Sequence, residues 1–154
     1  MTKALLFDDS KSFLNILHNA LTTAGFVVIS TSNKKDFFFY LKAFKPDVVL
    51  VDVFQQKVDG RTICKQINEN QNFSNIPVIL MSENPYALTN YAEFGAIDSI
   101  VKSSTVSEMV EKIKHTAANN YQFITLQKNS NRVNNYSNLF IHRFSLSSIT
   151  KLFF

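Results

Sequence analysis

The chain has 154 residues, of which 45% are hydrophobic, and a net charge of +4. This length suffices for one domain with a hydrophobic core and a modest additional element. A single cysteine, Cys64, excludes a disulfide-stabilised scaffold, and no apolar run approaches the ~20 residues of a membrane span. Because no signal peptide is recognisable at the start, we expect a cytoplasmic protein that does not bind a membrane.

Charge and composition change along the chain. Residues 1–111 contain 10 Lys/Arg and all 12 Asp/Glu, whereas residues 112–154 contain 6 Lys/Arg and no acid. From Asn119 onward the chain is rich in Asn, Ser and aromatic residues. We therefore expect a domain over residues 1–118 and a basic extension over residues 119–154. The periodicity of the extension does not decide between a hairpin and a helix exchanged with a second subunit.

Strand and helix patterns alternate along residues 1–118. Short apolar runs predict buried strands, and apolar residues three and four apart predict amphipathic helices. The expected strands are residues 4–7, 26–29, 48–51, 78–81 and 97–101. Ser10 and Asn33 are expected helix N-caps, Gly25 is an expected C-terminal stop, and Pro85 suits the first turn of a fourth helix. The alternation predicts an α/β fold, a three-layer sandwich of a five-stranded parallel sheet flanked by five helices.

Four of the expected strands lead directly into polar side chains. Asp8 and Asp9 follow the first strand, Asp52 the third, Ser82 the fourth and Lys102 the fifth. In an open parallel sheet, ligands bind beyond the carboxyl ends of the strands. A buried carboxylate is costly unless it is paired or bound to a cation, and oxygen ligands alone suit Mg²⁺. We expect these five side chains to converge on one pocket.

The same residues, together with the segments 58–60 and 95–98, resemble the receiver domain of two-component response regulators. The resemblance covers roughly residues 2–118. It implies a flavodoxin-like fold with strand order 2-1-3-4-5 and a bacterial signalling phosphoprotein. Such a domain is not an enzyme in the usual sense, because it catalyses only its own phosphorylation from phosphohistidine.

The resemblance also implies a role for each residue. Asp52 would be the phosphoacceptor, and Lys102 and Ser82 would contact the phosphoryl oxygens. The implied Mg²⁺ ligands are Asp8, Asp9, Asp52 and the backbone carbonyl of Phe54. A histidine kinase or a phosphotransfer protein would be the partner that supplies the phosphoryl group.

Two departures from the receiver pattern leave an alternative open. Ser99 stands where an aromatic switch residue is usual, and Ser103 where proline usually follows the lysine, so we expect a trans peptide and a shifted lysine. The alternative is a pseudo-receiver, a protein-interaction module that works without phosphorylation. A phosphohydrolase with an aspartyl nucleophile is disfavoured because Phe54 stands where such an enzyme needs a second acid.

Two further partners follow from the length and charge of the chain. A homodimer is expected through the face of the fourth strand, the fifth strand and the last helix, or through residues 119–154. Nucleic acid is not expected as a partner, because this extension is too short for a winged-helix domain and its basic residues are spread thinly.

Overall fold

The computed structural model describes residues 1–55 and 58–119. They belong to the first of two units into which the chain divides, Met1–Asn120. The expected extension lies outside the described residues from residue 120 onward, so the predictions made for it stay predictions. None of the described helices has the length and apolar character needed to cross a membrane.

Five parallel strands form the central sheet, in the order β2-β1-β3-β6-β7. The strands are β1 (Lys3–Phe7), β2 (Val27–Thr31), β3 (Val48–Asp52), β6 (Val78–Ser82) and β7 (Asp98–Val101). Numbered within this sheet alone, the order is the expected 2-1-3-4-5. Two short strands, β4 (Phe54–Gln55) and β5 (Val58–Asp59), form a separate antiparallel pair directly after β3. This pair is not anticipated by the sequence.

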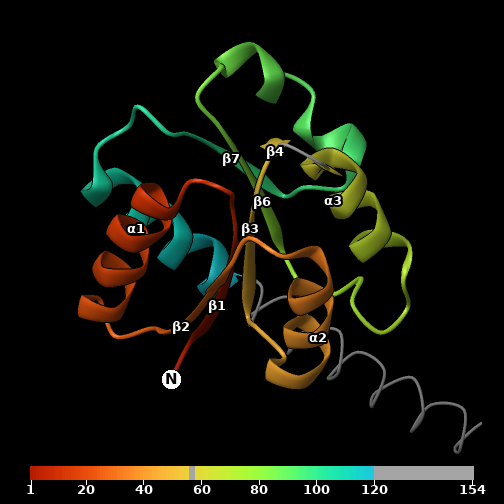
Figure 1. Ribbon diagram of the computed structural model, residues 1–154, viewed down its shortest axis with the longest axis horizontal. Helices are drawn as coiled ribbons and strands as arrows, with labels where there is room; N and C mark the ends of the chain where they lie inside the picture. The colour runs from red at the N-terminus through yellow and green to blue at the C-terminus, as the bar shows by residue number, and fades with distance from the viewer. Residues whose placement is uncertain (56–57, 120–154) are drawn as a thin grey trace, which may run out of the picture. The chain divides into compact units, whose positions relative to one another are not determined.

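Helices cover both faces of the sheet and confirm the expected three-layer sandwich. Helix α1 (Lys11–Thr23) and the last described helix (residues 106–119) lie on one face. Helices α2 (Lys34–Phe44) and α3 (Gly60–Glu69) lie on the other (Figure 1).

The expected helix ends are confirmed. Ser10 Oγ accepts a hydrogen bond from Phe13 N at 3.4 Å, and Asn33 Oδ1 accepts one from Lys35 N at 2.8 Å. These contacts satisfy backbone donors that have no partner within their helix. Gly25 follows α1 with φ of +90°, the left-handed conformation that glycine adopts at low cost.

The prediction of a fourth α-helix starting near Pro85 is wrong. The segment that starts at Pro85 forms two short 3₁₀ helices, η1 (Pro85–Leu88) and η2 (Tyr91–Phe94). Between them, Asn90 has φ of −122° and ψ of 33°, outside the helical range. Thr89 and Asn90 are weak helix formers, and Gly95 ends the segment at φ of +84°. The apolar residues of this segment are therefore too few and too interrupted to sustain an α-helix.

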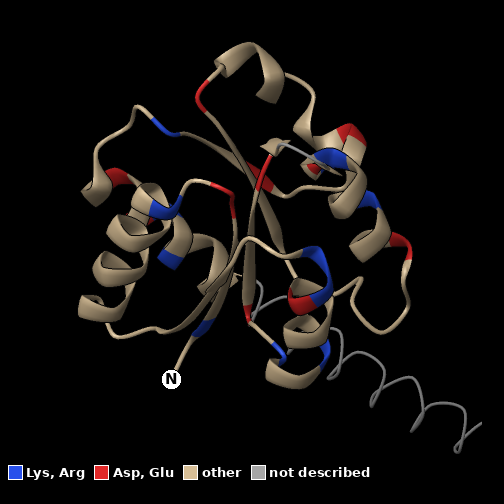
Figure 2. Cartoon of the chain, viewed as in Figure 1, with Lys and Arg blue, Asp and Glu red and all other residues tan. Residues whose placement is uncertain are grey.

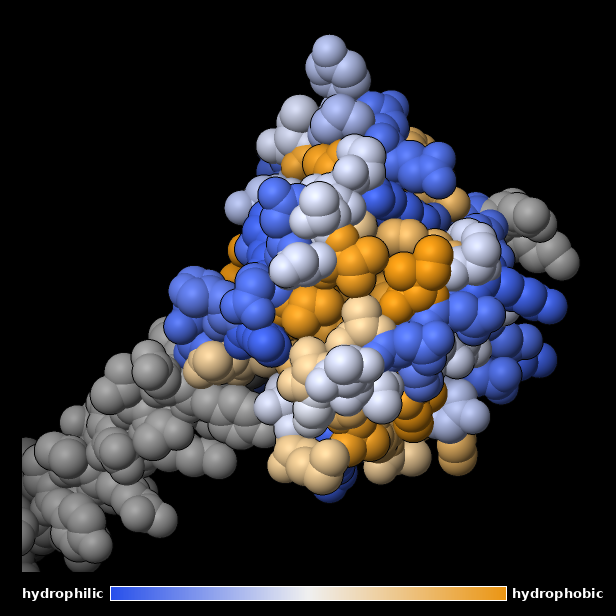
Figure 3. Space-filling model, turned by 90° about the vertical axis from the view of Figure 1, so that its left-hand side faces the viewer, coloured by the Kyte–Doolittle hydropathy of each residue, from blue (hydrophilic) through white to orange (hydrophobic). Residues whose placement is uncertain are grey.

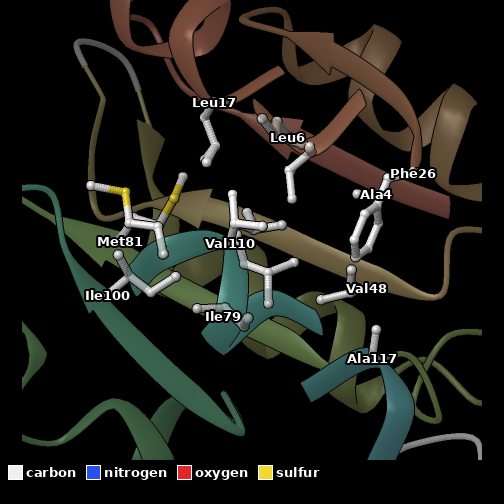
Figure 4. Packing of buried hydrophobic residues seen from close by; sticks show 14 of the residues in the cluster. Ala4, Leu6, Leu17, Phe26, Val48, Ile79, Met81, Ile100, Val110 and Ala117 are labelled. Atoms are coloured by element: carbon white, nitrogen blue, oxygen red, sulfur yellow. The ribbon is translucent and has the colours of Figure 1, made fainter. Parts of the chain in front are cut away.

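Two hydrophobic clusters fill the space between the sheet and its helices. Alternate residues of β3 point to opposite faces, so Leu50 packs toward α1 and the last described helix whereas Val49 and Val51 pack toward α2 and α3. Figure 4 shows the first cluster, where Leu6 and Leu17 meet across the layer boundary. Fully burying a side chain of this size stabilises the fold by roughly 1.5–3 kcal/mol.

Apolar side chains also reach the surface of the layer that α1 and the last described helix form. In the view onto this side of the molecule, hydrophobic atoms gather among hydrophilic ones (Figure 3). The exposed large apolar residues of these two helices are Ile16 of α1 and Val106 of the last described helix.

Gly60 brings the start of α3 against the end of β3. Its backbone N donates to Val53 O at 3.0 Å, and a Cβ at this position would overlap the carbonyl oxygen of Asp52. The residue is buried and its φ is not positive, so close approach of two backbones, not a left-handed turn, requires glycine here.

We expect Gly60→Ala to lower the free energy of unfolding by about 1–3 kcal/mol, although alanine is the better helix former. The added methyl group forces β3 and α3 apart. Gln66→Ala, on the exposed side of the same helix, is the matched control. Urea unfolding of the two variants measures the difference, and equal stability would contradict the close approach.

Candidate functional site

The predicted site residues meet at one edge of the central sheet. Asp8 directly follows β1, Asp52 ends β3, Ser82 ends β6 and Lys102 directly follows β7. Figure 2 shows acidic segments at the ends of β1 and β3 and a basic segment in the loop after β7. Because all five strands are parallel, their carboxyl ends lie at the same edge, as the sequence predicts.

Three carboxylates crowd together at this edge. One oxygen each from Asp8, Asp9 and Asp52 lies within 4.8 Å of the others. Asp8 is fully buried, Asp52 is 3% exposed and Asp9 is half-buried. Charges of one sign at this separation, partly out of water, repel each other, and a nearby cation stabilises them.

The ammonium group of Lys102 supplies positive charge to two of these carboxylates. Its Nζ lies 2.7 Å from Asp8 Oδ2 and 2.8 Å from Asp52 Oδ1, and its side chain is only 8% exposed. Both contacts are short, so the ammonium is the positively charged partner of Asp8 Oδ2 and of Asp52 Oδ1. Burial alone would lower the pKa of Lys102, but its contacts with Asp52 and Asp8 outweigh burial and raise it.

Burial has the largest effect on the pKa of Asp52, the predicted phosphoacceptor. It raises the pKa of Asp52 from 3.8 to about 6, against the opposing hydrogen bond from Lys102. The negative charges of Asp8 and Asp9 add to the increase. A nucleophilic carboxylate at this position is therefore more basic than an exposed aspartate.

Ser82 is fully buried at the end of β6. Its Oγ accepts a hydrogen bond from Asn84 N at 3.1 Å, a contact that leaves the hydroxyl proton available for another acceptor. The carbonyl oxygen of Ser82 accepts from Lys102 N at 2.9 Å. This backbone contact fixes the two strand ends that present the hydroxyl and the ammonium.

Phe54 lies in β4, two residues after Asp52. The residue is 56% exposed, and its ring centroid lies 5.9 Å from the guanidinium carbon of Arg61. The neighbouring Gln55 donates from Nε2 to Phe7 O at 3.3 Å and so connects the β4–β5 pair to β1. The role of the Phe54 carbonyl as a metal ligand stays a prediction.

The two departures from the receiver pattern are visible in the backbone. Ser99 pairs with Leu80 in the sheet, and its carbonyl accepts from Lys112 Nζ at 2.6 Å. No peptide bond in the described ranges is cis, so the bond between Lys102 and Ser103 is trans as expected. With this trans bond, the Lys102 ammonium still contacts the carboxylates of Asp8 and Asp52.

A cavity of about 580 Å³ adjoins the site on the side of Asp9. Its walls come from the end of β1, the start of α2 and the β4–β5 pair. The lining residues are Phe7, Asp9, Ser32, Asn33, Lys34, Lys35, Gln55 and Val58. Of the three carboxylates, Asp9 is the one that lines this cavity.

One residue near the site is not singled out by the sequence. The ring centroid of Phe13 lies 4.8 Å from Lys102 Nζ. In the sequence Phe13 is one of several apolar residues at helical spacing, and nothing distinguishes it from those of the core. Only the tertiary structure brings it to the lysine.

The comparisons with known proteins agree with this fold. Residues 4–114 match the family model of the response regulator receiver domain, and the chain belongs to that family. A probable transcriptional regulator, ycf27, of Guillardia theta is 30% identical over 118 residues, covering 73% of this chain and 44% of the relative. The alkaline phosphatase synthesis transcriptional regulatory protein PhoP of Bacillus subtilis is 27% identical, covering 73% and 47%. The chain thus spans less than half the length of these curated relatives.

Solved structures show the same fold. A response regulator from Thermotoga maritima has a TM-score of 0.68 and 27% identity, covering 77% of this chain and 98% of that structure. A putative response regulator from Chloroflexus aurantiacus has a TM-score of 0.71 and 24% identity, covering 76% and 98%. The chain is therefore a receiver domain of the type used in two-component signalling.

The raised pKa of Asp52 predicts a pH-dependent stability in metal-free buffer. In the unfolded chain Asp52 loses its proton near 3.8, whereas the folded protein retains it until about 6. Between these values the unfolded state binds fewer protons, so rising pH favours unfolding. The wild type should lose roughly 1–3 kcal/mol relative to Asp52→Asn over this window, and the difference should then stay constant.

Asp59→Asn provides a control of opposite sign. The hydrogen bonds that Asp59 accepts from Arg61 lower the pKa of Asp59 from 3.8, so here the wild type gains stability relative to the variant as pH rises toward 3.8, and the difference stays constant above that pH. Urea unfolding at a series of pH values measures both differences. A wild-type stability that stays parallel to that of Asp52→Asn from about pH 4 to about pH 7 would contradict the raised pKa.

Proposed function

We propose that this chain is a phosphoacceptor receiver module of a phosphorelay and takes a phosphoryl group onto Asp52. The observation that carries the proposal is the setting of this carboxylate. It ends the fully buried strand β3, has carboxylate oxygens of Asp8 and Asp9 within 4.8 Å, and lies 2.8 Å from the ammonium of Lys102. An ion pair with a purely structural role needs one carboxylate for the lysine, whereas three carboxylates lie together here.

The proposed reaction is a transfer between two nucleophiles. An oxygen of Asp52 attacks the phosphorus of a phosphohistidine whose other ring nitrogen carries a proton. A P–O bond forms, the P–N bond breaks, and its electron pair stays on the histidine nitrogen, so the ring leaves as neutral imidazole. Catalysis of such a transfer consists mainly of positioning and electrostatic stabilisation. Lys102 would place positive charge next to the phosphoryl oxygens, and the Ser82 hydroxyl would donate a hydrogen bond to them.

The donor set also suits a divalent cation. Hard oxygen ligands are those that Mg²⁺ prefers, and one oxygen each from Asp8, Asp9 and Asp52 lies within 4.8 Å of the others. We propose that Asp8, Asp9, Asp52 and the backbone carbonyl of Phe54 hold the ion. Bound Mg²⁺ supplies positive charge that neutralises the phosphoryl oxygens during transfer.

A pseudo-receiver is the second candidate, and Ser99 and Ser103 favour it. Ser99 has no ring that could turn toward a phosphorylated site, and its carbonyl is engaged by Lys112. The cluster of three carboxylates and the contact of Lys102 with Asp52 support the phosphoacceptor instead. Phosphorylation of Asp52 separates the two candidates.

The partners follow from the proposed reaction. A histidine kinase or a phosphotransfer protein would supply the phosphoryl group. The proposed assembly is a homodimer, through the face of β6, β7 and the last described helix or through residues 119–154. Relatives named transcriptional regulators stand at odds with the expectation that nucleic acid is not a partner. The aligned part is less than half of those relatives, so we propose no nucleic-acid contact for the receiver domain itself.

We expect the wild type to gain the mass of one phosphoryl group on incubation with acetyl phosphate and Mg²⁺. Asp52→Asn should gain none, because it lacks the nucleophilic carboxylate, whereas Asp36→Asn on the exposed side of α2 should gain as much as the wild type. Intact-mass spectrometry measures all three. If the wild type gains nothing, the pseudo-receiver replaces the phosphoacceptor.

Addition of Mg²⁺ should shift backbone amide resonances around Asp8, Asp9 and Asp52, because the ion neutralises three neighbouring carboxylates. Asp9→Asn should weaken binding at least about tenfold, since it removes one charged ligand. Asp36→Asn again serves as the control. Spectra of the wild type that do not change near these residues at ~10 mM Mg²⁺, a generous concentration for an oxygen-ligand site, would overturn the metal site.

A further inference from the structure

Within residues 1–55 and 58–119, three groups of two kinds lie next to the ammonium of Lys102. Two are the carboxylates of Asp8 and Asp52, at 2.7 and 2.8 Å. The third is the ring of Phe13, whose centroid lies 4.8 Å from Nζ. A cation over an aromatic face within about 6 Å is attracted by the negative face of the ring.

The burial of this contact makes it strong. The Lys102 side chain is 8% exposed, so its ammonium has lost most of its water. Cation–π attraction is weakest at exposed sites and strongest when the cation is desolvated. Lysine is a point charge on a flexible four-carbon stem, and carboxylates alone do not fix its direction of approach.

The turn that presents Phe13 also positions Asp8. Asp8 Oδ1 accepts from Ser10 N at 2.8 Å, and Ser10 Oγ accepts from Phe13 N at 3.4 Å. The remainder of α1 is anchored in the core through Leu14 and Leu17. One rigid turn therefore carries both the carboxylate and the ring that meet the ammonium.

The backbone of Lys102 is fixed separately. Its N donates to Ser82 O at 2.9 Å, and Ser104 N donates to Val101 O at 2.9 Å in the turn that follows β7. The two ends of the lysine are thus held by different elements, the backbone by β6 and the ammonium by α1 and the carboxylates.

We propose that Phe13 is a positioning residue that holds the Lys102 ammonium beside Asp52, an inference that rests on the proposed phosphoacceptor function. Two of the three neighbours of Lys102 are carboxylates, for which a divalent cation competes. An aromatic ring is not a ligand for a hard cation, so the ring retains the ammonium when Asp8 binds metal. Phe13 thereby keeps Lys102 available for the phosphoryl oxygens.

The first test does not depend on phosphorylation. In ¹⁵N-edited spectra, the ring current of Phe13 should shift the Lys102 ammonium protons upfield in the wild type, with and without Mg²⁺. Phe13→Leu, which keeps an apolar side chain but removes the ring, should abolish the shift, and Phe13→Tyr should restore it. Phe39→Leu, which removes an exposed ring from α2, is the matched control. An ammonium signal that is the same in the wild type and in Phe13→Leu overturns the proposal.

A double-mutant cycle measures the strength of the contact. Phe13→Leu and Lys102→Met, combined, should show a coupling that changes the folding equilibrium by about twofold to thirtyfold. The cycle removes the general packing cost of losing the ring, because that cost is the same with lysine and with methionine. Additive effects of the two substitutions overturn the proposal.

The last test addresses transfer. Phe13→Leu should lower the maximal rate of phosphorylation from acetyl phosphate about threefold to tenfold, with little change in the concentration that gives half-maximal rate. Phe13→Tyr should recover most of the rate, and an unchanged maximal rate in Phe13→Leu overturns the positioning role. A wild type that is never phosphorylated overturns the proposed function instead, and the spectra and the cycle then decide alone whether Phe13 holds Lys102.

Discussion

The two ion pairs of Lys102 with Asp8 and Asp52 are the contacts on which the rest of the site depends. Without the ammonium, two almost fully buried carboxylates would face each other, and breaking a buried ion pair typically costs about 3–5 kcal/mol. The pairs form only if β1, β3 and β7 end at the same edge of the sheet. Strand register, the start of α1 and the turn after β7 are therefore all constrained by one small group of charges.

The hydrophobic core supplies the stability that this charged edge lacks. Buried ion pairs add little net stability, because the cost of removing charges from water offsets most of their attraction. The raised pKa of Asp52 shows that this carboxylate is less favourably placed than in water, even beside Lys102. Every residue of β3 is buried, as is every residue of its neighbour β6, so the strand that carries this carboxylate is held by apolar packing along its whole length.

The sequence predicts the site better than it predicts some of the segments around it. Strand ends and helix caps depend on local rules, so Asp8, Asp52, Ser82 and the caps Ser10 and Asn33 lie where expected. The β4–β5 pair could not be foreseen, because two-residue strands have no periodicity and a tertiary hydrogen bond from Gln55 to Phe7 connects the pair to the sheet. The expected fourth helix fails because Pro85 marks a start but the polar residues that follow do not sustain a helix. Phe13 and Lys102 are far apart in the sequence, so local rules do not predict their contact. Apolar periodicity does not distinguish a ring that faces a cation from one that faces the core.

The position of Lys102 links the charged edge to the outermost strand of the sheet. Lys102 directly follows β7, which pairs only with β6 within the described sheet. The free side of β7 is held by Lys112, whose ammonium lies 2.9 Å from Asp98 Oδ1 and donates to Ser99 O at 2.6 Å. An edge strand has fewer backbone restraints than a central one. We therefore expect a change in the partners of Lys102 to act on an edge strand of the sheet through its backbone, a connection that does not require an aromatic side chain at Ser99.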